Sequence, residues 1–468
     1  MKAQRTFGLI LSLVLLAAGS GLARGARPRG PSAAAGVNAS SATGAPWFTF
    51  EVDTPGDTGL YTSVVYDPSL GATYISYYDA TNQALRIARD DRFVNNCGPD
   101  EDWHCKTLDT TGADVGKYSS IAVRPAGTGM GIAYHDATNG HLKYLWFENP
   151  NLWVHHIETI DKGASADFPT GLHTSLKYGS DGTPFIAYQF ENPGGADALM
   201  LASYVGSGGN CGYDYVANEW RCDTIDFGDG VGQYASLALD RNGHKHIAYY
   251  DGYNHDLWYA TSAPGSGTQP NCGPDNSWTC YQVDGSTAHD VGKHASIYVD
   301  DDNRFHIAYY DETDDDLKYA FGVDPGKGNC ALGWAQCAKI DDMQADYHPL
   351  GVSIAEDAAG YPMIAYQSSD GDLNLARPLV ALDLLPGGEC ERACGPENPF
   401  ATWCCETIDP SGTWVPYRNG DYLSLAVNSI GLPTIAYYRL YTEHSDGNLV
   451  VAYQPGQQIF LPLVMRNQ

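Results

Sequence analysis

Short apolar runs recur along the chain in a fixed order, separated by polar, glycine-rich turns. The clearest copies of this pattern, residues 235–260 and 295–320, both contain the phrase His-Ile-Ala-Tyr-Tyr-Asp. One serine stands at the same point of every copy: Ser63, Ser120, Ser175, Ser236, Ser296, Ser353 and Ser424. Successive serines lie 55 to 71 residues apart, so the chain contains seven copies of one unit.

Each copy holds four short apolar runs, which in the fourth copy are residues 236–240, 244–251, 256–260 and 280–284. An Asn-Gly turn separates the first two runs, which is typical of a β-hairpin. Four strands per unit and seven units predict an all-β fold, a seven-bladed β-propeller of four-stranded antiparallel blades. A linear solenoid of the same repeats is the alternative.

The seventh copy ends without a fourth run, and the missing run is found at the other end of the chain. Six copies end in a strand of one style, such as residues 105–109 and 280–284. The seventh stops at Tyr453, whereas residues 48–53 have the style of such a strand and precede the first copy. We therefore expect the N-terminal strand to complete the last blade and so to close the ring without an exposed edge.

The first residues have the pattern of an export signal. Lys2 and Arg5 precede an apolar run over residues 7–18, and small residues follow. We expect a signal peptide at 1–26, a flexible linker at 27–45, the propeller at 46–455 and a C-terminal tail at 456–468. An N-terminal membrane anchor is the alternative for the first segment, and no other segment has 18 consecutive apolar residues.

The composition restricts the classes of molecule that the protein is expected to bind. The chain carries 27 Lys and Arg against 56 Asp and Glu, a formal net charge of −29. Nucleic acid and anionic membrane surfaces attract basic proteins, so nucleic acid is excluded as a predicted partner and an anionic membrane surface is disfavoured. We also expect no membrane span in the mature chain. We expect a secreted or cell-surface monomer whose partner is an extracellular glycan or protein.

Twelve cysteines in an exported chain predict disulfides. Eight lie between the third and fourth strands of their copies, as Cys97/Cys105, Cys211/Cys222, Cys272/Cys280 and Cys330/Cys337. Alignment of the sixth copy with the others pairs Cys394 with Cys405, which leaves Cys390 with Cys404. Zinc is the alternative, but its ligands usually lie two to four residues apart, and most of these gaps are longer.

Two positions before the anchor serine, six copies carry a tyrosine or histidine side chain: Tyr61, Tyr118, His173, Tyr234, His294 and Tyr422. Lys117, Gln233 and Lys293 lie beside three of them. Because the innermost strand of each blade begins here, we expect these rings, with Lys117 and Lys293, to surround the mouth of the central channel and bind ligand. Packing between blades is the alternative for the tyrosines, and a structural role is the alternative for the histidines.

The loops on the same face are acidic, most densely over residues 311–316. Several carboxylates there can hold Ca²⁺, but the spacing of an EF-hand loop is missing, so a solvated acidic loop is the favoured alternative. The aspartates that follow Tyr-Tyr can also cap tight turns through their side chains. We predict no metal site and no other cofactor.

Catalytic patterns are missing from the sequence. It contains no G-x-S-x-G, H-E-x-x-H or phosphate-loop pattern. Carboxylates are too abundant for one pair to be assigned to glycoside hydrolysis. Enzymatic activity is therefore not predicted, and no catalytic residue is named.

The seven-copy pattern over residues 47–453 resembles exported bacterial seven-bladed propellers, which are grouped loosely with sialidase-like (BNR-repeat) proteins and propeller lectins. The resemblance is one of architecture. The sialidase Asp-box is not matched, its nearest phrase being residues 236–247, and the arginines occupy no repeated position. Residues 459–466 are similar to short Leu-Pro-Leu-Val endings of exported proteins in some filamentous bacteria, with a plain extra strand as the alternative.

Three functional hypotheses follow. The first is a secreted, non-enzymatic binding propeller that recognises a glycan or a protein segment on the face with the aromatic residues. The second is a glycoside-cleaving enzyme, similar to a sialidase, that uses carboxylates near the channel mouth. The third is a purely structural extracellular protein, in which the tyrosines contribute to stability alone.

Overall fold

The computed structural model describes residues 46–90, 96–98, 102–111, 114–125, 129–149, 154–264, 271–323, 327–331, 333–343, 351–379, 390–391, 402–411, 417–443 and 445–454. The predicted signal peptide (1–26), linker (27–45) and C-terminal tail (456–468) lie outside these ranges. Among the described residues there is one short 3-10 helix, Pro274–Asn276, and no helix has the length and hydrophobicity that crossing a membrane requires.

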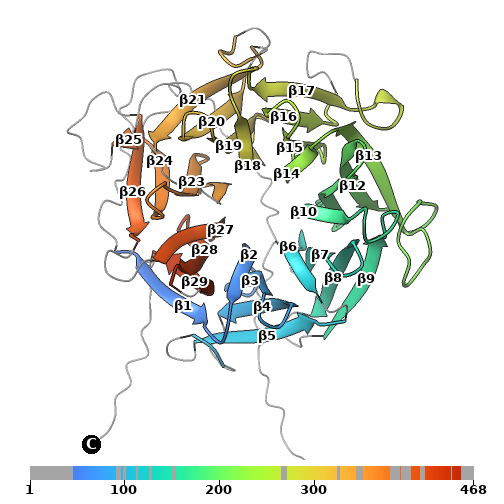
Figure 1. Ribbon diagram of the computed structural model, residues 1–468, viewed down its shortest axis with the longest axis horizontal. Coiled ribbons are helices and arrows are strands. Elements are labelled where there is room, and N and C mark those ends of the chain that lie inside the picture. The colour runs from blue at the N-terminus through green and yellow to red at the C-terminus, as the bar shows by residue number, and fades with distance from the viewer. Residues whose placement is uncertain are drawn as a thin grey trace, which may run out of the picture. The chain divides into compact units, whose positions relative to one another are not determined.

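Seven separate antiparallel sheets are arranged around a common centre, so the predicted seven-bladed propeller is confirmed (Figure 1). The strands of blades 1 to 4 are β2 (Thr58–Asp67), β3 (Ala72–Asp79), β4 (Ala84–Asp90), β5 (Trp103–Asp109); β6 (Val115–Val123), β7 (Met130–Asp136), β8 (His141–Asn149), β9 (Val154–Asp161); β10 (Thr170–Tyr178), β11 (Pro184–Phe190), β12 (Asp197–Tyr204), β13 (Trp220–Gly228); β14 (Val231–Leu239), β15 (Lys245–Asp251), β16 (Asp256–Thr261) and β17 (Thr279–Asp284). Those of blades 5 to 7 are β18 (Val291–Val299), β19 (Phe305–Asp311), β20 (Asp316–Gly322), β21 (Ala335–Asp342); β22 (Val352–Glu356), β23 (Pro362–Gln367), β24 (Leu373–Pro378), β25 (Cys390–Glu391), β26 (Trp403–Asp409); β27 (Tyr417–Val427), β28 (Pro433–Tyr441), β29 (Asp446–Tyr453) and β1 (Phe48–Asp53).

The N-terminal strand closes the ring as the sequence predicts. β1 pairs antiparallel with β29, with Phe48 opposite Tyr453 and Glu51 opposite Val450. In Figure 1 the blue β1 forms the outer edge of the sheet whose other strands are the red β27, β28 and β29. Because the first strand of the chain belongs to the last blade, the two ends of the propeller are joined by a sheet ladder.

Blade 6 departs from the predicted four strands. Its sheet has a fifth strand, β25, which pairs parallel to β26 with Cys390 opposite Trp403. The long insertion between the third and fourth strands of this blade carries β25. The repeat pattern has no counterpart for that insertion, and the sequence therefore does not predict the strand.

The anchor serines join every blade to the next. The hydroxyl of each serine accepts a hydrogen bond from the backbone N–H of the following blade, one residue after that blade's own serine. The seven N···O distances are 2.9 to 3.1 Å, from Ser63 to Ile121, Ser120 to Leu176, Ser175 to Leu237, Ser236 to Ile297, Ser296 to Ile354, Ser353 to Leu425 and Ser424 to Val64. The serine recurs because the bond recurs at all seven blade contacts.

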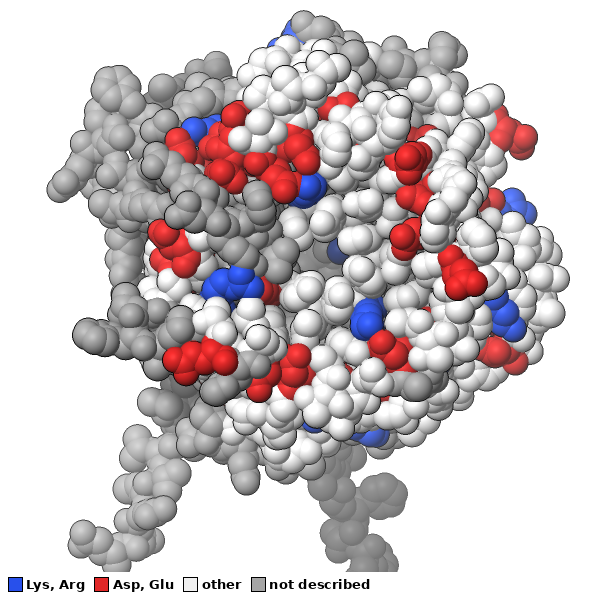
Figure 2. Space-filling model, viewed as in Figure 1, with Lys and Arg blue, Asp and Glu red and all other residues white. Residues whose placement is uncertain are grey.

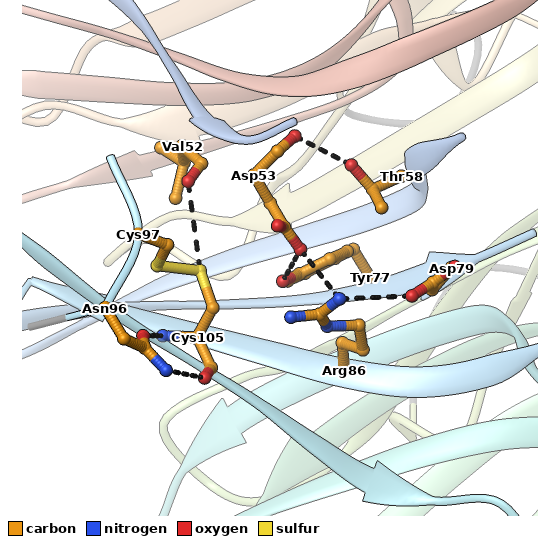
Figure 3. The surroundings of a disulfide bond; sticks show 9 residues. All are labelled: Val52, Asp53, Thr58, Tyr77, Asp79, Arg86, Asn96, Cys97 and Cys105. Carbon is orange, nitrogen blue, oxygen red and sulfur yellow. Dashed lines mark hydrogen bonds and ion pairs between the residues drawn. A yellow bond between two sulfur atoms is a disulfide. The ribbon is translucent and has the colours of Figure 1, made fainter. Parts of the chain in front are cut away.

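A tyrosine–aspartate contact joins the blades farther from the centre. In each second strand, the tyrosine that follows Ala or Ser donates its hydroxyl to an aspartate at or near the end of the last strand of the preceding blade. The seven pairs are Tyr77–Asp53, Tyr134–Asp109, Tyr188–Asp161, Tyr249–Asp226, Tyr309–Asp284, Tyr366–Asp341 and Tyr437–Asp409. Figure 3 shows the pair at the ring closure, where Arg86 also contacts Asp53.

Four of the predicted disulfides are confirmed: Cys97–Cys105, Cys211–Cys222, Cys272–Cys280 and Cys330–Cys337. Cys404 and Cys405 are also disulfide-bonded. Their predicted partners, Cys390 and Cys394, have side chains outside the described set, so these two pairings stay predictions. In Figure 3 the first disulfide lies beside β1, and Asn96 bonds the backbone of Cys105 on both sides.

Candidate functional site

The six ring-bearing residues predicted for the channel mouth share an unusual backbone conformation. Tyr61, Tyr118, His173, Tyr234, His294 and Tyr422 have φ between 50° and 54°, in the left-handed region. The pairing of the first and second strands shifts register at each of them, which marks a β-bulge. A bulky side chain is rare in this conformation. Its repetition fixes the direction of all six rings.

These side chains form one continuous row, which we call the aromatic arc. Neighbouring rings have centroids 4.4 to 4.8 Å apart, in the order Tyr422, Tyr61, Tyr118, His173, Tyr234 and His294. Adjacent ring planes are tilted by 45° to 56°, so each ring leans on the next rather than stacking flat on it. The structure thus brings together all six rings that the sequence singled out.

The seventh position of the row is Gly351, so the row of rings is interrupted between His294 and Tyr422. A Cβ atom at Gly351 would lie 2.6 Å from the carbonyl oxygen of Gly420, so no side chain fits there without backbone movement. The pairing of β22 with β23 also has no register shift. Sequence reasoning missed this gap, although Gly351 stands two residues before the anchor serine of its copy.

The arc borders a central cavity of about 250 Å³. The cavity is lined by the arc, by Gly351 and by the next two residues of each innermost strand, the second of which is the anchor serine. Figure 2 shows the hollow at the centre of this face; the described residues around its rim are mainly neither acidic nor basic, and basic atoms are visible inside it. The described lining holds hydroxyl, imidazole and aromatic groups, and none of its members is Asp, Glu, Lys or Arg.

The arc is uncharged at neutral pH. Burial lowers the pKa of His173 to about 4 and, with the nearby His173 and Lys293, lowers that of His294 to about 3. Burial likewise raises the pKa of Tyr234 to about 12. Neutral imidazoles and phenols each offer both a donor and an acceptor, so the arc can bind hydroxyl-rich groups as well as apolar ones.

The two predicted lysines lie just outside the cavity, in ion pairs. Nζ of Lys117 is 2.7 Å from Asp114 and lies 5.5 Å from the ring centre of Tyr78. Tyr78 donates its hydroxyl to the same aspartate, at 2.7 Å. These contacts hold Lys117 at the border of the site.

Lys293 is held in the same way. Its Nζ is 3.1 Å from Asp290, also contacts Glu312, and lies 5.6 Å from the ring centre of Tyr250. Tyr250 donates its hydroxyl to Asp290 at 2.7 Å. Sequence reasoning missed these tyrosine–aspartate supports, although each aspartate stands four residues before an arc residue.

The acidic loops cap turns, as one of the two interpretations predicts. Oδ1 of Asp79 and of Asp136 accepts a backbone N–H three residues later, at 2.9 and 3.0 Å. Asp311 does the same for Thr313 and Asp314, at 3.1 Å each. His289, Asp311 and Asp314 have potential ligand atoms within 4.8 Å of one another, but Lys318 lies 3.4 Å from Asp311. Nothing beyond this geometry favours Ca²⁺.

Together, the sheets and the cavity define a seven-bladed β-propeller with an aromatic central mouth. No protein-family model matches the chain, and no curated protein matches it. Among solved structures it is similar to a Dyadobacter fermentans protein of unknown function, with 10% identity, 87% of this chain and 97% of the other covered, and a TM-score of 0.43.

The chain is also similar to the polysaccharide lyase Uly1, with 9% identity, 84% and 89% of the two chains covered and a TM-score of 0.45. A Hadza microbial sialidase, Hz136, shows 10% identity, 85% and 66% coverage and a TM-score of 0.37. These are likenesses of distant backbones. The assignment of the fold rests on the seven sheets of this chain.

Proposed function

We propose that the protein is an exported binding propeller whose central mouth holds a neutral glycan. The observation that carries this proposal is the aromatic arc, six rings in unbroken contact at the rim of a cavity. Aromatic rings provide flat apolar surface, and their hydroxyls and ring nitrogens provide hydrogen bonds. A sugar ring offers the complementary pair of surfaces, an apolar C–H face and a hydroxyl-bearing edge.

The charges near the mouth favour a neutral ligand. His173 and His294 are uncharged because burial lowers their pKa. Lys117 and Lys293 are paired with Asp114 and Asp290. Because both lysines predicted for the mouth are held in ion pairs, the site favours a neutral sugar over an acidic one.

Binding is better supported than cleavage. Glycoside hydrolysis needs two carboxyl groups that flank the scissile bond. The carboxylates of Asp114 and Asp290, which border the mouth, are engaged by lysine and tyrosine outside the cavity. The glycosidase hypothesis would require a carboxylate to enter the cavity on ligand binding.

Export is part of the same proposal. Four disulfides in hairpin loops are typical of proteins that fold outside the reducing cytosol. We infer that residues 1–26 act as the export signal and that the propeller works outside the cell, as a monomer. Mass determination of the exported chain would reveal cleavage near residue 26, and an intact N-terminus would contradict this part.

A glycan array on the oxidised, mature chain tests the ligand class. We expect neutral glycans to bind and the Tyr234→Gly variant to lose that binding. Glycine suits the left-handed backbone, so the variant removes the ring without adding strain. An array without hits would contradict the glycan proposal and direct attention to a protein segment. Retained binding by Tyr234→Gly would place the ligand elsewhere.

The purely structural hypothesis predicts a different result. The hydroxyls of Thr62, Ser119 and Thr174 bond the backbone carbonyls of arc residues in neighbouring blades, not their rings. Ring removal at Tyr234 leaves these bonds intact. A large fall in the thermal midpoint of Tyr234→Gly, without any ligand found, would therefore favour a structural role for the ring.

A further inference from the structure

A second cavity, of about 510 Å³, lies between blades 4 and 5. We call it the blade 4–5 pocket; its lining includes Asp240, His246, Tyr281, Phe305 and Trp334. The residues after β14 contribute to this pocket, whereas the aromatic arc lies at the start of β14, so the two sites are at opposite ends of one strand. Its volume is in the range of small-molecule sites.

Aromatic side chains form one continuous part of the lining. Trp334, Tyr281, Tyr259 and Phe305 contact one another in sequence, with ring centroids 5.6, 5.3 and 4.5 Å apart. Trp334 is half-buried, and the other three are buried. The face of an aromatic ring has a negative electrostatic potential, which attracts cations. Four packed rings bring several such faces close together.

The charged part of the described lining is one carboxylate, Asp240, and one guanidinium, Arg304. Burial acts to raise the pKa of Asp240, but hydrogen bonds from His244 and the backbone lower it, so its carboxylate is ionised. Arg304 lies 2.8 Å from Asp300 and 3.5 Å from Asp302, so its charge is paired with carboxylates that are not part of that lining.

One buried polar atom of the lining lacks a partner. His246 is 2% exposed, and its Nδ1 is hydrogen-bonded to the hydroxyl of Tyr259. Its Nε2 has no hydrogen-bond partner and lies 3.8 Å from Oδ2 of Asp240, too far for a hydrogen bond. The lining therefore contains a buried ring nitrogen whose hydrogen-bonding capacity the protein itself does not satisfy.

The next blade shows the same residues in a closed arrangement. His306 corresponds to His246, and its Nε2 lies 3.1 Å from Asp300. The ring of Tyr298 stacks on His306, 4.5 Å away with planes 5° apart. Across the strand pair, Tyr298 stands opposite His306, whereas Ala238 stands opposite His246. The small residue at 238 cannot stack on His246 as Tyr298 stacks on His306.

We propose that the blade 4–5 pocket binds an organic ammonium group, with its charge against the rings of Trp334 and Tyr281 and near the carboxylate of Asp240. A quaternary or primary ammonium carried on a short chain has the required charge and apolar surface. An anion would instead be repelled by the ionised carboxylate of Asp240. This site is independent of the proposed glycan site.

Isothermal titration with choline and tetramethylammonium tests the proposal, with 3,3-dimethylbutan-1-ol as the uncharged isostere of choline and glucose as a neutral sugar. We expect both cations to bind, and the isostere and glucose to bind at least tenfold more weakly. Cation binding should also weaken as salt is added. Failure of both cations to bind, or equal binding of choline and its isostere, would overturn the proposal. Glucose binding that is preferred over choline and lost in Trp334→Ala would overturn it too, and would make the pocket a sugar site.

Two substitutions locate the binding. Ala238→Tyr copies the closed blade 5, and Trp334→Ala removes a half-buried ring from a loop, so a folding defect in one leaves the other informative. We expect each to weaken choline binding at least tenfold. Tyr253→Ala, which removes an exposed ring remote from the pocket, is the control and should leave binding unchanged. Unaltered choline binding in both pocket variants would contradict the assignment.

Discussion

At the scale of the residue, the same few side chains make the same contacts between all seven pairs of neighbouring blades. Each blade presents one serine hydroxyl to the next blade and one tyrosine hydroxyl to an aspartate of the previous blade. The environments of these aspartates differ. Asp109 also accepts from Lys143 at 2.6 Å, whereas the same oxygen of Asp226 has the hydroxyl of Tyr249 as its described partner. Identical contacts therefore contribute unequally to stability.

The first prediction compares these two contacts. Tyr249→Phe leaves a half-buried carboxylate oxygen of Asp226 without its described donor, and we expect a loss of about 1–3 kcal/mol in the free energy of unfolding. Tyr134→Phe leaves Lys143 on Asp109, so its loss should be smaller. Denaturant unfolding of both variants measures the difference. Equal losses would show that the lysine does not compensate.

A pair of buried glutamates leads to a prediction of pH dependence. Glu158 in β9 and Glu219 just before β13 are 4% and 6% exposed. Burial, with the neighbouring Glu219, raises the pKa of Glu158 to about 8 from an ordinary value of 4.5. The folded state thus holds this proton more tightly than the unfolded state, and stability falls as the pH rises from about 4.5 to about 8.

Glu158→Gln should remove that dependence, since glutamine keeps a donor and cannot ionise. We expect the variant and the parent chain to have similar stability at pH 5, and the variant to be the more stable at pH 9. Thermal unfolding across this range provides the comparison. Parallel pH profiles of the two proteins would show that Glu158 does not titrate between these limits.

At the scale of the element, the repeat made most strands predictable. Three residues recur because each makes the same contact in every blade: the anchor serine, the tyrosine of the second strand and the aspartate of the last strand. β1 was recognised by its final aspartate and its apolar pattern. The contact of Asp53 with Tyr77 now explains that resemblance. β25 has no counterpart in the repeat, so its prediction would require knowledge of long-range pairing.

The sequence predicted the position of the site, but it did not predict the backbone conformation of the arc or the second pocket. The spacing from the anchor serine located all six arc residues, because the innermost strands must surround the centre. A left-handed backbone can be expected from a sequence at glycine or asparagine, so it was not predictable at Tyr118 or His294. Opposite His246, which lines the blade 4–5 pocket, stands Ala238, whereas Tyr298 stands opposite the corresponding His306, and this difference becomes meaningful only when both environments are seen.

Removal of the closing strand provides a prediction at this scale. A chain that begins at residue 54 lacks β1, so β29 has a free edge and Tyr77 and Arg86 lose Asp53. We expect the thermal midpoint to fall by about 10 °C or more, since each kcal/mol shifts the midpoint of a large domain by about 2 °C. A chain that begins at residue 46 is the control, and a peptide of residues 46–53 should restore stability. An unchanged midpoint would contradict the role of β1 in closure.

At the scale of the whole molecule, closure produces a rigid ring with two different cavities. The central mouth is uncharged and bordered by six rings, although the chain as a whole has a formal net charge of −29. The blade 4–5 pocket combines packed rings with the buried carboxylate of Asp240. We therefore propose that one scaffold offers a neutral site to hydroxyl-rich ligands and an aromatic site to cations.

The central claim is that the aromatic arc binds a neutral glycan through its rings. The most direct measurement is calorimetric titration of the strongest array glycan into the parent chain, Tyr234→Phe and Tyr234→Gly. We predict one site per chain, affinity within about threefold of the parent for Tyr234→Phe, and a loss of at least about tenfold for Tyr234→Gly, which corresponds to about 1.4 kcal/mol. Equal affinity of Tyr234→Gly and the parent chain would contradict the claim.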